Sequence, residues 1–163
     1  MNNEHIQDLI GIIKEHKKLN MNTYLDHGKG TPLPENSEAF HECGNSACIA
    51  GYMGLLPSFI AMGGEQSLCG IPLLSYEGEG KVYSSSSYSF WRFAGIKSMP
   101  LAMAIVGRVA WDSYTCYSID GWEKWDWVDA VYILKNLEML DSMDLDKTIE
   151  WLSAVQLLSN GDK

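Results

Sequence analysis

The feature that most limits the fold of this chain is a long uncharged stretch, residues 43–64. A stretch of this length without charge either spans a membrane or is buried in a protein core. Its proline, Pro57, and its frequent glycines favour burial. We therefore expect a short buried helix over 46–55, ended by Pro57, and no membrane span. The glycines of this stretch are Gly44, Gly51, Gly54, Gly63 and Gly64.

Apolar residues at helical spacing predict most of the remaining structure. Helices are expected over 4–19, 46–55, 100–109, 120–140 and from 146 or 148 onward, with a helix and a glycine turn over 58–70. Two short apolar runs within 71–83 predict a β-hairpin, and the serines of 84–87 predict a loop. The 163 residues suit one domain. The sequence therefore predicts a compact, mainly α domain of about five helices over 1–163, or α+β if the hairpin forms.

The start of the chain and its cysteines predict a compartment. Acidic and polar residues at the N-terminus replace the basic start and unbroken apolar run of a secretory signal. Four cysteines without such a signal indicate reduced thiols. We therefore expect a cytoplasmic protein. The cysteines are Cys43, Cys48, Cys69 and Cys116.

Charge is strongly acidic and unevenly spread. The chain has 12 basic and 21 acidic residues and a net charge of −9, so direct nucleic-acid binding is not expected. Residues 110–163 alone hold eleven acidic and four basic side chains. In this half, Asp141, Asp144 and Asp146 are predicted to be helix caps and solvated acids.

Four acids recur every third residue within the helix expected over 120–140, where they would form a slanted stripe. A carboxylate stripe of this density could imitate a row of phosphates and occupy the basic groove of a protein that handles nucleic acid. Two nearby tryptophans would be its apolar anchors. An ordinary solvated helix face with core tryptophans is the alternative. The predicted contact residues are Asp120, Trp122, Glu123, Trp125, Asp126 and Asp129.

A second group of residues suggests metal or thiol chemistry. His41, Cys43 and Cys48 lie within eight residues, and His27 could be a fourth ligand of a tetrahedral zinc ion. A helix N-terminus at Cys48 would favour a reactive thiolate, as in the similar nucleophile region of papain-like proteases. All four histidines precede Cys48, however, which is the wrong chain order for those enzymes. The remaining interpretation is that Cys48 packs as a small apolar residue.

Three blocks carry a resemblance to a family: 20–24 (NMNTY), 43–52 (CGNSACIAGY) and 127–131 with Leu134 and Leu137. They resemble small bacterial and phage proteins with an F-x-M-x-x-W block, a C-G-T-x-A-C-I-A-G-W block and a late A-x-x-x-L-x-x-L block. Tyr24 and Tyr52 stand where that pattern has tryptophan, and Asn45 where it has threonine. The resemblance implies a phage or mobile-element setting and singles out Cys43, Cys48 and Gly51.

The leading hypothesis is a non-enzymatic, acidic interaction protein of a phage or mobile element that needs no cofactor. It would inhibit a host nuclease or other nucleic-acid-binding defence protein by covering its basic surface. The alternative hypothesis is a zinc- or thiol-dependent protein centred on Cys43, Cys48 and His41.

Overall fold

Short helices make up most of the chain where its structure is described. The computed structural model describes residues 1–21, 25–26, 46–66, 71–74, 76–78, 81–83, 86–106 and 124–159. The helices of these ranges are α1 (Asn3–His16), α3 (Ile49–Gly54), α4 (Pro57–Ala61), α5 (Ser86–Ala94), α6 (Met99–Val106), α7 (Trp127–Lys135), α8 (Leu137–Ser142), α9 (Leu145–Ser153) and α10 (Val155–Ser159). They confirm the predicted mainly helical class, in more and shorter helices than the five expected.

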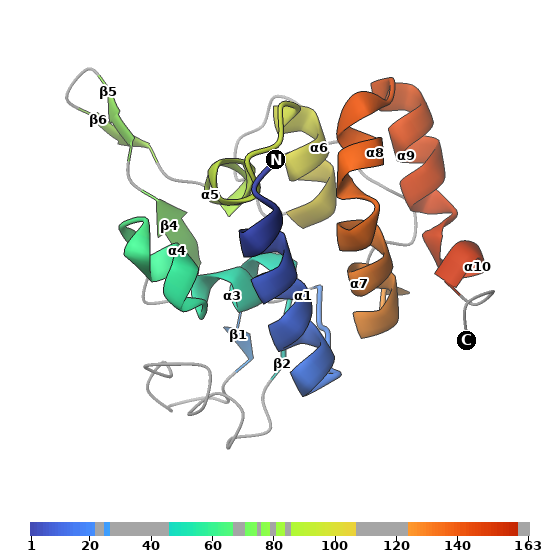
Figure 1. Ribbon diagram of the computed structural model, residues 1–163, viewed down its shortest axis with the longest axis horizontal. Coiled ribbons are helices and arrows are strands. Elements are labelled where there is room, and N and C mark those ends of the chain that lie inside the picture. Colours follow the sequence, from blue (N-terminus) through green and yellow to red (C-terminus); the bar gives the residue numbers. More distant parts are fainter. Residues whose placement is uncertain are drawn as a thin grey trace.

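Strands in the described ranges form three two-stranded antiparallel pairs. The pairs are β1 (Leu25–Asp26) with β2 (Ser46–Ala47), β3 (Gly64–Gln66) with β4 (Pro72–Leu74), and β5 (Tyr76–Gly78) with β6 (Lys81–Tyr83). The β5–β6 pair is the hairpin predicted within 71–83, and it projects from the helical body at the upper left of Figure 1. The small α+β variant of the prediction is therefore the one that forms.

Apolar spacing and caps define α1 as predicted, although it ends earlier than expected. Ile6, Leu9 and Ile13 are among its buried residues, and the Asn2 side chain accepts a hydrogen bond from the His5 backbone N–H. Lys17 adopts a left-handed conformation with φ of 53° and closes the helix, because its N–H donates to the Ile13 carbonyl. The helix thus stops before Asn20.

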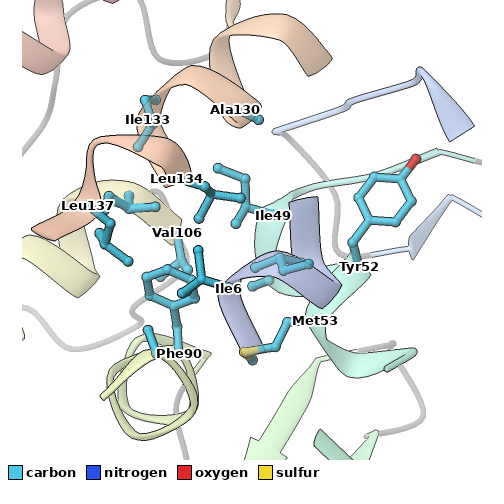
Figure 2. Packing of buried hydrophobic residues seen from close by; sticks show 14 of the residues in the cluster. Ile6, Ile49, Tyr52, Met53, Phe90, Val106, Ala130, Ile133, Leu134 and Leu137 are labelled. Atoms are coloured by element: carbon cyan, nitrogen blue, oxygen red, sulfur yellow. The ribbon is translucent and has the colours of Figure 1, made fainter. Parts of the chain in front are cut away.

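One core joins helices from both ends of the chain. Figure 2 shows side chains of α1, α3, α5, α6, α7 and α8 converging on a common centre. Ile6, Ile49, Phe90 and Ile133 contribute to it, and each is almost fully buried. Helix α7 packs against α1 and α10, and α9 packs against both α6 and α10. Helices α8 and α9 follow one another at the C-terminal side of the body (Figure 1). The arrangement leaves the outer surfaces of α8 and α9 available to solvent.

The uncharged stretch is buried within this core where it is described. Every residue of α3 is buried, and Pro57 begins the next helix, α4, instead of only ending α3. Gly64 lies so close to Phe59 that a Cβ atom there would overlap the phenyl ring, which makes glycine necessary at this turn. No helix among the described residues has the length and apolar character needed to span a membrane.

Two predicted boundaries are wrong. The serine run was expected to be a loop, but Ser86 and Ser87 are buried in α5, and Ser89 Oγ of the same helix accepts a 2.9 Å hydrogen bond from the Leu74 backbone N–H. The helix expected over 120–140 begins only at Trp127 and is interrupted at Asn136, where α8 follows. Both differences reflect hydrogen bonds between side chains and backbone that apolar periodicity does not reveal.

Candidate functional site

The described part of the predicted acidic stripe forms a helix cap. Asp126 is the N-cap of α7, and its carboxylate accepts hydrogen bonds from the N–H groups of Val128 and Asp129 at 2.8 and 3.1 Å. Asp129 completes the capping box by accepting from the Asp126 N–H at 2.8 Å. Asp129 is only 3% exposed. The helical stripe is therefore wrong as predicted, because the helix starts after Asp126 and its Asp129 faces inward.

The predicted apolar anchor Trp125 is also a core residue. It is 4% exposed and belongs to the same hydrophobic cluster as Ile133 and Leu134. A side chain buried to this extent offers no surface to a partner, which corrects its assignment as a contact residue. The remaining predicted contact residues, Asp120, Trp122 and Glu123, lie outside the described residues.

A different set of carboxylates is exposed around the turn between α8 and α9. We call this set the acidic corner; it comprises Glu138, Asp144, Asp146 and Glu150. Asp144 is the N-cap of α9 and accepts a 3.1 Å hydrogen bond from the Asp146 N–H, as predicted for a cap. No ion pair joins these four carboxylates to a lysine or arginine among the described residues. As far as the described residues extend, their charge is therefore available to a partner.

An exposed apolar residue lies within the same corner. Met139 follows Glu138 on α8 and is 42% exposed, the largest exposed fraction among the methionines and leucines described in α7 to α10. Apolar contact surrounded by charge is typical of protein interfaces, whose centre excludes water and whose rim stays polar. The acidic corner thus combines negative charge that is unpaired within the described ranges with an apolar contact point.

Asp141 has a structural role at the edge of this corner. Its carboxylate accepts hydrogen bonds from the backbone N–H groups of Lys97, at 3.0 and 2.9 Å, and of Ser98, at 2.9 Å. Ser98 immediately precedes α6, and its Oγ accepts from the Leu101 N–H at 3.2 Å. A carboxylate in this position satisfies unpaired donors at a helix start. Asp141 therefore fixes α8 to the turn between α5 and α6.

The structure gives Cys48 a capping role. Its Sγ accepts a 3.4 Å hydrogen bond from the Gly51 N–H at the start of α3. Burial raises the pKa of this thiol to about 11, and backbone hydrogen bonds only partly oppose that change. The thiol is thus protonated near neutral pH, the opposite of the reactive thiolate that the helix N-terminus had suggested.

The nearest titratable neighbours support a structural interpretation of this region. Burial likewise raises the pKa of Tyr52 to about 12, and its hydroxyl donates a 2.6 Å hydrogen bond to the Lys18 carbonyl. His16 packs on the Tyr52 ring with centroids 5.3 Å apart. These contacts tie α3 to the end of α1. His27, His41 and Cys43, the other predicted zinc ligands, lie outside the described residues, and within those residues no group of three metal-ligating side chains is found.

Comparison with protein families, curated proteins and solved structures finds no match to this chain. Function must therefore be argued from the surface itself.

A second surface group, on α5, was not predicted from the sequence; its Arg92 is exposed, and its Tyr88 and Trp91 are partly exposed. Tyr88, Trp91 and Arg92 lie on one face of this helix, and Arg92 Nη1 donates a 3.2 Å hydrogen bond to the Tyr88 hydroxyl. The rings of Tyr88 and Trp91 have centroids 5.7 Å apart. Their i, i+3, i+4 spacing was visible in the sequence, but the expected serine loop concealed the helix that brings them together.

Proposed function

We propose that this chain is a non-enzymatic interaction protein that binds a basic protein surface through its acidic corner. The observation that carries the proposal is the set of four exposed carboxylates without ion-pair partners among the described residues. Opposite charges that meet across an interface speed association and select the partner. Occlusion of the partner's surface, without a chemical step in this chain, is the proposed mechanism.

The proposed partner is a host protein that handles nucleic acid, such as a defence nuclease. Proteins of this class present clustered lysine and arginine to phosphates, and carboxylates can occupy the same clusters. The formal charge of −9 opposes direct contact of this chain with the nucleic acid. The setting that accompanies this proposal is the bacterial cytoplasm during infection by a phage or transfer of a mobile element.

The placement of charge supports the corner over the rest of the described surface. Residues 124–159 hold seven acidic and three basic side chains, whereas acidic and basic side chains nearly balance in the other described ranges. Asp126, Asp129 and Asp141 each accept backbone hydrogen bonds, which leaves the corner to supply the outward charge. Within residues 124–159, the exposed carboxylates are therefore those of the acidic corner.

Competition with DNA tests the proposal. The immobilised chain is incubated with a bacterial extract, and the bound proteins are eluted with duplex DNA and identified by mass spectrometry. The expected result is a basic nucleic-acid-binding protein that DNA displaces and whose DNA cleavage or DNA binding the free chain inhibits. A retained protein that binds DNA and this chain at the same time would contradict occlusion.

A matched pair of variants locates the binding surface. Glu138→Lys/Glu150→Lys reverses two charges of the corner, and Glu15→Lys/Glu65→Lys makes the same change in net charge at exposed positions elsewhere. The corner variant should lose capture and inhibition, and the control variant should retain most of both. Equal losses would show that only the overall charge of the chain matters.

A further inference from the structure

A continuous strip of the surface connects the aromatic face of α5 to the acidic corner. Contacts between side chains run along it in order, from the Arg92–Tyr88 hydrogen bond to the Tyr88–Trp91 ring contact. Trp91 Nε1 then donates a 3.4 Å hydrogen bond to the Lys97 carbonyl, and Asp141 accepts from the Lys97 N–H. Glu138 lies one helical turn before Asp141. We call the six residues the bipolar strip: Tyr88, Arg92, Trp91, Lys97, Asp141 and Glu138.

The two ends of the strip carry opposite charge. Arg92 and Lys97 are exposed cations, and residues 86–106 contain no acidic side chain, although the chain as a whole is strongly acidic. At the other end, Glu138 is exposed. Within the described residues, neither Arg92 nor Lys97 forms an ion pair with a carboxylate. Among the described residues, Arg92 and Glu138 thus have no ion-pair partner, and each could pair with the other residue of a second copy.

We propose that the bipolar strip is a self-association surface, on which a second copy of this chain lies antiparallel. A two-fold axis places the same patch of each subunit on its partner, so the patch must complement itself. Antiparallel alignment of two strips brings Arg92 of each subunit to Glu138 of the partner subunit, in two equivalent pairs. This inference does not rest on the proposed function.

The side chains of the strip suit such a contact. Tryptophan, tyrosine and arginine are the residues most often found to dominate binding energy at interfaces. Trp91 and Tyr88 are partly exposed at one end, and Met139 is 42% exposed beside Glu138 at the other. The aromatic pair and Arg92 therefore supply the apolar and charged contact area at one end of the strip.

The position of the strip is fixed by the fold. Asp141 holds α8 to the turn between α5 and α6 through three short hydrogen bonds. That turn contains Gly95 at φ of 61°, a backbone conformation that favours glycine. A surface with fixed geometry loses little conformational entropy when it binds. The two charged ends are thus presented at a constant separation.

Sedimentation equilibrium tests the inference, over about 1 µM to about 1 mM protein. The salt concentration is 0.15 M, where a Debye length of about 8 Å screens the general repulsion between two chains of charge −9. The native chain should approach twice its mass of 18.2 kDa as concentration rises. A chain that keeps the monomer mass over the whole range would overturn the proposal.

Charge exchange identifies the contact. Arg92→Glu and Glu138→Arg should each weaken self-association at least tenfold, because each places like charges together. The double variant Arg92→Glu/Glu138→Arg restores both opposite pairs at unchanged net charge, and it should recover most of the native dimer. Circular dichroism checks that each variant is folded. Dimerisation that Arg92→Glu leaves intact, or that the double variant does not recover, would contradict the proposed alignment.

Two variants separate this inference from the proposed function. Arg92→Glu should abolish the dimer and leave capture of the DNA-binding partner at least as strong as in the native chain, because Glu138 of the acidic corner is then not paired with a second copy. Glu150→Lys, which lies outside the strip, should weaken that capture and leave the dimer intact. Each proposal can therefore fail while the other stands.

Discussion

Helix α3 and the acidic corner differ in almost every physical respect. All residues of α3 are buried, the helix carries no charge, and its capping thiol accepts a backbone hydrogen bond. The corner is exposed, carries four carboxylates and has no ion pair within the described residues. The more distinctive sequence block thus builds the interior, whereas the plainer acidic residues form the available surface. A cysteine, a histidine or a carboxylate indicates a functional site only where solvent or a partner can reach its side chain.

The largest predicted effect comes from the α3 side of this comparison. Ile49→Ala should lower the free energy of unfolding by about 2–5 kcal/mol, because it leaves a cavity in the fully buried cluster. Met139→Ala in the corner should change it by less than about 0.5 kcal/mol. Urea denaturation measures both values. If Ile49→Ala does not fold, Ile49→Val should still cost about 0.5–1.5 kcal/mol, and similar costs for Ile49→Val and Met139→Ala would remove the contrast.

Alkaline pH should destabilise the α3 region. Burial raises the pKa of the Cys48 thiol from 9.0 to about 11, so the folded state holds its proton more tightly than the unfolded state does. The resulting stability is complete below pH 9 and is lost as pH rises toward 11, by about 3 kcal/mol in total. Free energies of unfolding measured from pH 8 to 11 give this loss.

The variant Cys48→Ala tests whether the Cys48 thiol causes this loss of stability. In Cys48→Ala the decline should begin about one pH unit later, since Tyr52, whose pKa rises from 10.0 to about 12, then titrates first. An unchanged onset near pH 9 would show that another group is responsible.

The α7 cap should contribute stability independently of partner binding. Asp126→Ala removes the acceptor of two backbone N–H groups and should cost about 1 kcal/mol. Asp126→Asn keeps an accepting oxygen and should cost only a few tenths. Thermal denaturation of the two variants compares these costs. Equal effects of Asn and Ala would argue against the cap and for a role of the charge itself.

The smallest effect on stability is expected in the corner. Glu138→Gln and Glu150→Gln should each change the free energy of unfolding by less than about 0.5 kcal/mol, because both side chains are exposed and unpaired within the described residues. The same variants should weaken binding to the captured partner. A loss of stability comparable with that of the cap variants would show that the corner is structural.

Apolar spacing was sufficient to predict much of the fold. The helix with Ile6, Leu9 and Ile13, the short helix before Pro57 and the hairpin within 71–83 all form, although α1 ends before residue 19 and residues 46–47, predicted to be helical, form β2. The spacing of apolar residues predicts these elements because burial of an apolar face dominates the stability of each element. The predicted caps at Asp144 and Asp141 also hold, although Asp141 serves a helix distant in sequence.

Local hydrogen bonds explain what the sequence did not reveal. The pair Asp126 and Asp129 has the spacing of a capping box, but the acidic stripe was placed on a helix that was assumed to begin earlier. Burial of Trp125 depends on how α7 packs against helices far away in the chain. The serines of α5 could not be distinguished from a loop by composition, because Ser89 is satisfied by the Leu74 N–H of a separate strand.

The most direct test of the account is the salt dependence of binding between the purified captured partner and three forms of this chain. The native chain and Glu15→Lys/Glu65→Lys should bind with similar affinity, which falls steeply as salt is raised from 50 to 200 mM. Glu138→Lys/Glu150→Lys should bind at least tenfold more weakly and with a shallower dependence on salt. Equal affinities and slopes for both double variants would contradict the central claim that the acidic corner is the docking surface.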